Sequence, residues 1–427
     1  MDFYSDTLNA IYNLRGGIID LRLDRMNEAL SLFGHPEKEF PSFHIAGTNG
    51  KGSTAAMLHR ILFQSGYRVA LYTSPHLVSF TERIRVGDEE IAPSEVVDLA
   101  NEISARIKVA DLQLTFFEFV TVMAFIHFAR RRIDVAVVEV GLGGRLDATN
   151  LVKPLVSLIS TISKDHEAYL GSDLLSIARE KAGIIKEGVP LICGALPASV
   201  AALIRDIADE RNARAYFLGE DFNFFLKDEE SFDYRGRSWR FNDLDLALLG
   251  VHQKRNAAIA LAGLEVANSD FQVTEAALRE GLKTVRWPGR FEILYDRPAI
   301  ILDGAHNGEG VRALVDALES FRRQRRILLL FAAMEDKDWR LMLETLTEAV
   351  DEVVLTRVNM ERCADPFYLA SEWDGKVPHR AIGNSQSALE YVLGRADGDD
   401  IVLIAGSLYL IGELRPLVQA WARGKST

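Results

Sequence analysis

The sequence predicts an α/β fold in which helices cover both faces of a parallel sheet. The prediction depends on short apolar runs that alternate with glycine-rich turns and helical stretches along the chain. Runs that are apolar throughout are typical of buried parallel strands, because helices cover both faces of such sheets. With 427 residues, and at about 150 residues per domain, the chain is long enough for two or three domains.

The first series of expected strands lies in the N-terminal half. Residues 42–46 form a short apolar run, and a glycine-rich turn and a helical stretch at 55–65 follow it. Three further apolar runs occupy residues 68–72, 135–140 and 156–162. This order predicts one large domain built on a parallel sheet.

A second series of expected strands follows after a break. Its apolar runs occupy residues 298–302, 326–332, 352–356, 380–382 and 401–405. They predict a smaller, Rossmann-like α/β domain at the C-terminal end of the chain.

The boundary between the two domains is expected near a Pro-Gly pair. Trp287-Pro288-Gly289-Arg290 interrupts the helical pattern, so we expect one domain over residues 1–290 and the other over 291–427. Residues 215–243 are rich in aromatic and charged side chains and predict short strands or an insertion. Ligands commonly bind at the carboxyl ends of parallel strands and between domains.

Composition and charge exclude several classes of protein. The chain has 49 basic and 61 acidic side chains and a net charge of −12, which argues against nucleic-acid binding because that needs a basic surface. The longest apolar stretch, 116–129, contains Glu118 and His127 and falls short of the roughly 20 apolar residues of a membrane span. Two cysteines suit a reducing compartment, and the first residues lack the long apolar run of a signal peptide. We therefore expect a cytoplasmic protein without a membrane partner.

A glycine-rich segment at residues 44–54, HIAGTNGKGST, lies between an expected strand and an expected helix. Glycines let backbone N–H groups approach phosphate oxygens closely, and the N-terminus of the following helix favours an anion. Lys51 supplies a positive charge for phosphates, and the hydroxyl of Ser53 or Thr54 can reach a Mg²⁺ ion. A plain glycine-rich turn is the alternative. The segment predicts a P-loop-type phosphate site formed by Gly47, Thr48, Asn49, Gly50, Lys51, Gly52 and Ser53.

Three polar side chains near strand ends are candidate metal ligands. Glu139 ends an apolar strand, and a carboxylate beside a phosphate loop is a ligand that Mg²⁺ prefers. Ser74 follows another strand, although it also suits a loop hydroxyl without a special role. His166 follows a third strand, but an imidazole is an unusual ligand for Mg²⁺ and a structural histidine is the alternative.

An aromatic segment with one acidic residue is a candidate binding site for a flat ring. Aromatic side chains can stack on such a ring and a carboxylate can bind its N–H edge, although an aromatic core is the commoner explanation. The segment comprises Thr115, Phe116, Phe117 and Glu118.

The segment GTNGKGS resembles the phosphate loop of the Mur ligase superfamily, whose members join a carboxylate to an amine with ATP. It departs from the strict phosphate-loop pattern at two positions, because Ile45 stands at the first glycine and Gly52 follows the lysine. Glycine after the lysine is similar to the branch of bifunctional folylpolyglutamate synthases and dihydrofolate synthases. Further motifs resemble this branch along nearly the whole chain, from Ile19–Arg25 to the last expected strand.

The resemblance implies a ligase that adds L-glutamate to dihydropteroate and to reduced folates through an acyl phosphate. ATP is then a co-substrate, two Mg²⁺ sites are expected, and the partners are small molecules bound by a monomer. The N-terminal domain holds ATP and the pterin, and the C-terminal domain is a glutamate-ligase domain. Three alternatives stay open: polyglutamation alone, a cell-wall amide ligase, or a phosphate-binding module without ligase activity. A cell-wall ligase needs a further N-terminal domain, for which little chain precedes Gly47.

The resemblance also implies roles for individual residues. It adds Asn256, Arg290 and Asp303 to the nucleotide site, and it places His306 near the phosphates or the incoming glutamate. It assigns Ser74 to the first metal and Glu139 with His166 to the second. It implies that the lysine of the EKAG motif, Lys181, is carbamylated to N6-carboxylysine; an unmodified lysine would be a cation near the γ-phosphate. It places the pterin beside Asp20, Leu21, Arg22, Leu146, Asp147 and Ala148.

Overall fold

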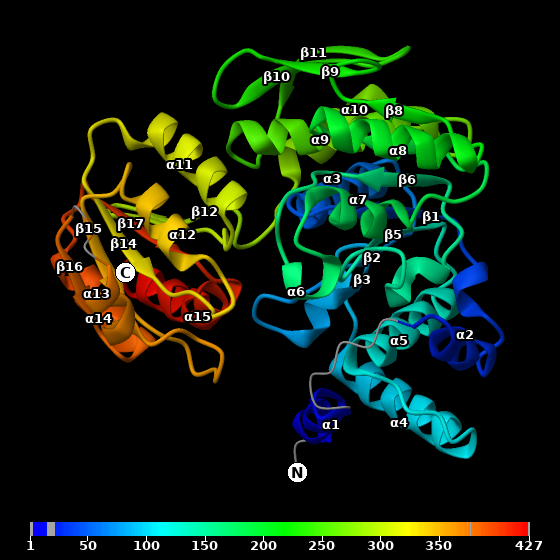
Figure 1. The fold of residues 1–427 in the computed structure, drawn as a ribbon, viewed down its shortest axis with the longest axis horizontal. Helices are drawn as coiled ribbons and strands as arrows, with labels where there is room; N and C mark the ends of the chain where they lie inside the picture. The colour runs from blue at the N-terminus through cyan, green and yellow to red at the C-terminus, as the bar shows by residue number, and fades with distance from the viewer. Residues whose placement is uncertain (1–2, 15–21, 374, 376, 426–427) are drawn as a thin grey trace. The chain divides into compact units, whose positions relative to one another are not determined.

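The computed structural model describes residues 3–14, 22–373, 375 and 377–425. The chain divides into two compact units (Figure 1). The first comprises Met1–Ala247 and Lys254–Val285, and the second comprises Leu248–Gln253 and Arg286–Thr427. The chain therefore passes between the units three times, once within a helix that starts at Val251.

The first unit is built on an eight-stranded sheet. Its central strand, β1, pairs in parallel with β5 and β6, whereas β3 and β4 form an antiparallel edge. The strand order in the sheet is β4 (Glu89–Glu90), β3 (Ile84–Val86), β2 (Val69–Tyr72), β5 (Val135–Glu139), β1 (Ser42–Ala46), β6 (Val156–Ile159), β7 (Leu191–Cys193) and β8 (Ala215–Phe217). All residues of β1, β2, β5 and β6 are buried, which confirms the parallel strands predicted from apolar runs.

Helices cover both faces of this sheet. On one face, α2 (Asp24–Ser31), α4 (Pro93–Val109) and α5 (Phe116–Arg130) form a core with β2 and β5. On the same face, α7 (Leu174–Ala182) and α8 (Ala198–Glu210) pack on β6 and β7. The opposite face carries α9 (Val251–Val266), whose Gly263 lies against Phe43 of β1 and Leu158 of β6. The remaining helices of the unit are α1 (Phe3–Tyr12), α3 (Lys51–Gln64), α6 (Glu167–Leu170) and α10 (Glu275–Thr284).

The predicted long apolar segment is the buried helix α5. Eleven of its residues, among them Glu118 and His127, are buried. No described helix combines the length and the apolar character that a membrane span requires.

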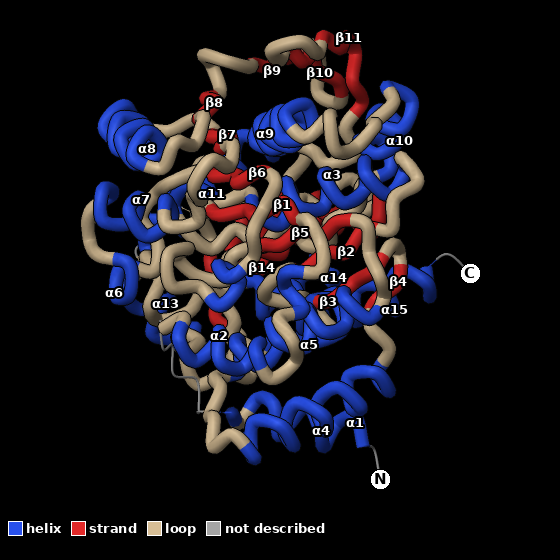
Figure 2. Tube along the Cα trace, turned by 90° about the vertical axis from the view of Figure 1, so that its right-hand side faces the viewer, coloured by secondary structure: helices blue, strands red, loops and turns tan. Residues whose placement is uncertain are grey.

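A small antiparallel sheet lies beside α9 (Figure 2). It consists of β9 (Asn223–Leu226), β10 (Ser231–Arg235) and β11 (Arg240–Asp245). These strands fall in the region that the sequence predicts to hold short strands or an insertion.

The second unit is built on a six-stranded mixed sheet. The strand order is β12 (Glu292–Asp296), β13 (Ala299–Leu302), β17 (Ile401–Ala405), β14 (Ile327–Phe331), β15 (Glu352–Leu355) and β16 (His379–Ala381). β12 pairs antiparallel with β13, and the other pairs are parallel. The helices are α11 (Gly308–Arg322), α12 (Trp339–Leu346), α13 (Pro366–Glu372), α14 (Ser385–Arg395) and α15 (Leu408–Lys425). The predicted C-terminal α/β unit is thereby confirmed.

Candidate active site

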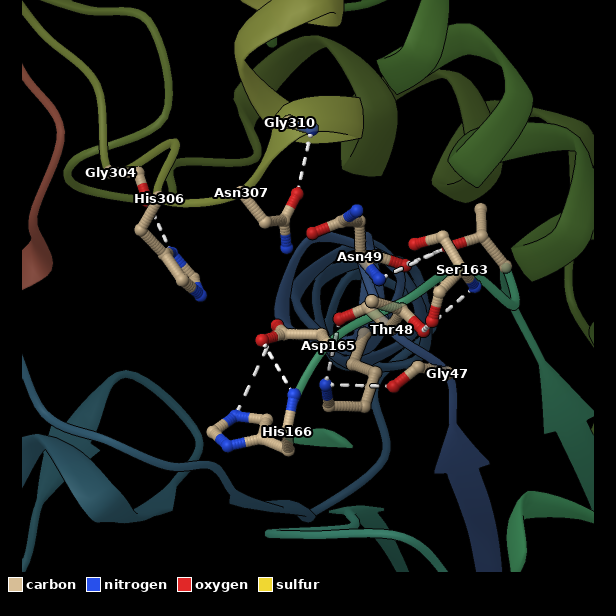
Figure 3. A network of polar contacts seen from close by, with 12 residues as sticks. Gly47, Thr48, Asn49, Ser163, Asp165, His166, Gly304, His306, Asn307 and Gly310 are labelled. Atoms are coloured by element: carbon tan, nitrogen blue, oxygen red, sulfur yellow. Dashed lines mark hydrogen bonds and ion pairs between the residues drawn. The ribbon is translucent and has the colours of Figure 1, made fainter. Parts of the chain in front are cut away.

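The glycine-rich segment forms the loop between β1 and α3. The backbone N–H of Thr48 donates to the carbonyl of Thr161 over 2.8 Å, and that of Asn49 donates to the Thr161 hydroxyl over 3.0 Å. The Ser160 hydroxyl donates to the Asn49 carbonyl over 2.6 Å. The Thr48 hydroxyl also contacts the backbone of Ser163 (Figure 3). The loop is therefore fixed to the chain that leaves the neighbouring strand β6.

Helix α3 starts at Lys51, directly after the loop. Gly50 caps it with a positive φ of 84°, a conformation that favours glycine. The first N–H groups of a helix have no partner within the helix and carry partial positive charge. The sequence thus brings a helix N-terminus and a lysine to the carboxyl end of the central strand, an arrangement that suits a phosphate group.

Two lysines share one backbone carbonyl in this loop. Lys51 Nζ donates to the carbonyls of Gly47 and Thr48 over 3.0 and 3.1 Å, and Lys181 Nζ donates to the same Gly47 oxygen over 2.9 Å. The Lys181 side chain is buried at the end of α7. Burial, and then the charge of Lys51, lower the pKa of Lys181 to about 7. A substantial fraction of this amine is therefore neutral at neutral pH.

Asn256, at the start of α9, lies against the loop at Gly50. A Cβ atom built on Gly50 would lie 2.4 Å from Asn256 Oδ1, so the two residues are in direct contact. The Asn256 side chain is buried. The structure therefore brings together the loop and Asn256, which are more than 200 positions apart in the sequence.

Replacing Gly50 with alanine is expected to impair nucleotide binding. The new methyl group would displace Asn256, and the positive φ would add about 1 kcal/mol of backbone strain. We expect the Kd for ATP to rise at least about tenfold. Isothermal titration calorimetry would measure it.

Gly66 provides a matched control at the other end of the same helix. Its φ is 90°, but a Cβ atom there would meet nothing within 4 Å. Gly66→Ala should therefore add the same backbone strain and leave the Kd for ATP unchanged. Equal losses in both variants would contradict the role given to the Gly50–Asn256 contact.

Two of the predicted metal ligands lie together. The Ser74 backbone N–H donates to Glu139 Oε2 over 3.2 Å, and Glu139 is buried at the end of β5. A serine hydroxyl and a carboxylate beside a phosphate loop are hard oxygen donors of the kind that Mg²⁺ prefers. These two residues fit a magnesium site.

His166 has a different environment. It has a φ of 52°, and its backbone N–H donates to the side chain of Asp165, which is almost buried (Figure 3). Within the described residues, no three His, Cys, Asp or Glu side chains form a cluster suited to a metal. The metal-binding role of His166 therefore stays a prediction. Asp165, which was not predicted although it directly precedes His166, also acts on Lys181, whose pKa its charge raises.

The aromatic segment forms the N-terminus of α5. Thr115 and Glu118 form a capping box, in which the Thr115 hydroxyl accepts from the Glu118 N–H and Glu118 accepts from the Thr115 N–H. The Phe116 ring stacks on Tyr12 with a centroid distance of 5.3 Å. The Phe117 ring lies against Gly141. The segment therefore contributes to the core, and its half-buried rings are a candidate surface for a flat ring.

Arg25 pairs with Glu118 and was not predicted. Its Nε and Nη2 atoms donate to the Glu118 carboxylate over 2.7 to 3.0 Å, and only 10% and 4% of the two side chains are exposed. Nothing local in the sequence marks this pair, because the residues are 93 positions apart. The Glu118 carboxylate, predicted to bind the N–H edge of a flat ring, thus already accepts hydrogen bonds from Arg25 and from Thr115.

Arg25→Met should destabilise the N-terminal unit. It leaves a buried carboxylate without its cation, which costs about 3–5 kcal/mol. Arg312→Met is the control, because Arg312 and Glu348 form an exposed pair of a kind that is usually worth about 1 kcal/mol or less. Urea denaturation would measure both changes, and equal values would contradict the importance given to the Arg25–Glu118 pair.

The loop that starts at Gly141 holds the other described pterin candidates. Asp147 is buried and accepts from the N–H groups of Leu142 and Thr149. Burial raises the pKa of Asp147 despite these hydrogen bonds. Ala148 is buried and Leu146 is half-buried. Arg22 is exposed and is the first residue of the described range 22–373, whereas Asp20 and Leu21 lie outside the described residues.

The candidates of the second unit lie around the start of α11. Asp303 is buried and accepts from the N–H groups of Phe291 and Ala305, both over 2.8 Å. Burial raises the pKa of Asp303, and the nearby Arg290 opposes this shift. His306 Nδ1 lies 2.8 Å from the Gly304 carbonyl (Figure 3). The structure thus brings Arg290, Asp303 and His306 to one end of the second unit's sheet.

Comparison with known proteins agrees with this arrangement. The Mur ligase middle domain matches residues 45–264, and the Mur ligase glutamate ligase domain matches residues 289–408. A dihydrofolate synthase/folylpolyglutamate synthase of Bacillus subtilis is 35% identical over 407 residues, which cover 92% of this chain and 94% of that protein. The chain belongs to the Mur ligase family, in its dihydrofolate synthase/folylpolyglutamate synthase branch. The predicted resemblance is confirmed.

Solved structures of this branch of the Mur ligase family share the fold. FolC of Escherichia coli in complex with DHPP and ADP has a TM-score of 0.91 and 33% identity, and the match covers 98% of each chain. The bifunctional enzyme of Yersinia pestis, complexed with AMPPNP and a manganese ion, has a TM-score of 0.88 and 33% identity, covering 97% of this chain and 98% of that one.

Proposed function

We propose that the protein is an ATP-dependent ligase that adds L-glutamate to dihydropteroate and to reduced folates. The observation that carries this proposal is the loop at residues 47–53, with its helix N-terminus and two lysines, in a chain that matches dihydrofolate synthase/folylpolyglutamate synthases over almost its whole length. Amide formation by Mur ligases needs both a phosphate site and a place for two further substrates. The two compact units provide the residues for these sites.

The reaction has two chemical steps. The substrate carboxylate attacks the γ-phosphorus of ATP, the bond to the β-phosphate oxygen breaks, and an acyl phosphate and ADP form. The neutral amine of glutamate then attacks the acyl carbon, the carbon–oxygen bond to phosphate breaks, the nitrogen loses a proton that the departing phosphate or solvent takes up, and an amide remains. Lys51 and the α3 N-terminus stabilise negative charge on the phosphates, and Asn256, Arg290 and Asp303 hold the nucleotide. His306 acts near the phosphates or the glutamate.

Two magnesium ions would complete the proposed site. Ser74 would contribute to the first, and Glu139 with His166 would hold the second, which a carbamylated Lys181 would brace. Magnesium supplies positive charge that neutralises the phosphate oxygens during transfer. The pKa of about 7 supports carbamylation, because only a neutral amine can attack CO₂. The amine nitrogen forms a bond to the carbon of CO₂ and releases a proton to solvent.

The folate site is proposed at the edge of α5 and the loop after β5. Its described residues are Arg22, Thr115, Phe116, Phe117, Glu118, Leu146, Asp147 and Ala148. Asp20 and Leu21, which the family resemblance adds, lie outside the described residues. The partners are thus small molecules, and we expect a monomer in the cytoplasm.

Mass spectrometry of the reaction products tests this function. The protein is incubated with ATP, dihydropteroate and glutamate, and in a second reaction with a reduced folate in place of dihydropteroate. Dihydrofolate in the first and longer glutamyl chains in the second are expected. Products only in the second reaction would restrict the enzyme to polyglutamation. ATP hydrolysis without any glutamyl product would contradict the proposal.

A further inference from the structure

The small sheet β9–β11 contacts α9 through two charged side chains of the helix. Lys254 Nζ donates to the carbonyls of Asp228 and Glu229, over 2.5 and 2.8 Å, in the turn between β9 and β10. Near the other end of the helix, the Glu265 carboxylate accepts from the Tyr234 hydroxyl and from the N–H groups of the turn between β10 and β11. Both turns of the sheet are therefore attached to one helix.

The spacing places both contacts on one face of α9. Lys254 and Glu265 are eleven residues apart, so they differ by only roughly 20° around the helix and by about 16 Å along it. Asn256 follows Lys254 by two residues and is turned by about 200° from it. This turn agrees with the contact between Asn256 and Gly50 on the other side of the helix. The first two turns of α9 are thus held between the small sheet and the phosphate loop.

Burying the ammonium group of Lys254 costs free energy, which its hydrogen bonds to the turn offset. Only 2% of the residue is exposed, and burial lowers the pKa of its ammonium group, while the charges of Asp228, Glu229 and Glu230 oppose the shift. The two carbonyls accept hydrogen bonds from the Lys254 ammonium group in place of water. Asp228 itself is fixed by hydrogen bonds from the N–H groups of Glu230 and Ser231, which makes the turn a defined acceptor.

The position of Lys254 along the chain adds a second observation. The division between the two compact units falls between Gln253 and Lys254, inside α9. Lys254 is therefore the first residue of α9 that belongs to the first unit. Its contacts fix the helix on that unit two residues before Asn256.

We propose that Lys254 is a positioning residue for ATP binding. By bonding to the β9–β10 turn, Lys254 holds Asn256 against the phosphate loop. The inference rests on the proposed function, because it takes ATP as the nucleotide. The role of the small sheet is then to fix α9 where this helix lines the nucleotide site.

Calorimetric titration of ATP into Lys254→Met tests the inference. We expect the Kd for ATP to rise about tenfold. With saturating ATP, kcat and the KM for glutamate should stay within about twofold of the wild type. Lys254→Arg, which can donate to both carbonyls, should restore most of the affinity. Lys227→Met is the control, because Lys227 precedes the same turn but pairs with Asp233, not with α9.

Several outcomes distinguish the possibilities. A wild type that binds no ATP would refute the proposed function. Unchanged ATP affinity in a folded Lys254→Met protein, or an equal loss in Lys227→Met, would refute only the inference.

A measurement on the wild type covers the case in which Lys254→Met does not fold. Binding and positioning are reciprocal, so ATP should slow amide hydrogen exchange at Glu230 and Ser231, whose N–H groups donate to Asp228. Unchanged exchange at these amides in the presence of saturating ATP would overturn the inference.

Discussion

Lys51→Ala is expected to lower glutamate-dependent ADP release by at least about a thousandfold. In the structure, the Lys51 ammonium group lies within the loop and donates to the carbonyls of Gly47 and Thr48. An incoming triphosphate offers the ammonium group a more strongly charged acceptor. Without Lys51, the charge that develops during phosphoryl transfer loses its nearest fixed cation. A coupled assay that follows ADP, with and without glutamate, measures the effect.

Lys108→Ala is the control for this experiment. Lys108 is an exposed residue in the last turn of α4, and its replacement should leave turnover unchanged. Near-normal turnover in Lys51→Ala would reject the assignment of the nucleotide to this loop.

Lys181→Met is expected to abolish ligation and to stabilise the protein at low pH. A thioether cannot be carbamylated, so we expect activity to fall by at least about a hundredfold. The effect on stability has the opposite sign, because the lysine is buried and methionine removes the cost of burying a cation.

The pH dependence of this stabilisation follows from the pKa. The ordinary pKa of a lysine is 10.5, and that of Lys181 in the folded protein is about 7. Below pH 7 the amine is charged in both states, so the cost of burial is complete. Between pH 7 and 10.5 the folded state has released the proton that the unfolded state still binds, so stability rises with pH.

Urea denaturation in CO₂-free buffer at pH 6 and pH 9 measures this difference. The methionine variant should be more stable than the wild type by roughly 2–4 kcal/mol at pH 6, and by less at pH 9. A variant that is less stable than the wild type at pH 6 would contradict the account of Lys181. Full activity of the variant would contradict its role in the reaction.

The sequence predicts the sheet better than it predicts the site. β5 is recognisable because every residue before Glu139 is apolar, as is typical of a buried parallel strand. β1 is almost as clear, although it carries the buried His44 at its centre. The phosphate loop is recognisable for a related reason, since its glycines and lysine are adjacent in the sequence. Local patterns of this kind carry their own signal.

Contacts between distant segments carry no such signal. Arg25 reaches Glu118 from 93 positions away, and Lys254 reaches a turn 25 and 26 positions before it. Each of these residues resembles an ordinary solvated charge when its neighbours in the sequence are considered alone. Only the fold shows that they are buried and paired. The contact between Gly50 and Asn256 is of the same kind, and only the resemblance to a family drew attention to Asn256.

A crystal structure with bound ADP would test the central claim most directly. We expect the phosphates to lie within the loop at residues 47–53, against the N–H groups at the N-terminus of α3, with Lys51 Nζ turned from the Gly47 carbonyl towards the β-phosphate. Asn256 should retain its contact with Gly50 beside the nucleotide. A structure in which the phosphates bind elsewhere, while this loop keeps the hydrogen bonds of the free protein, would contradict the account.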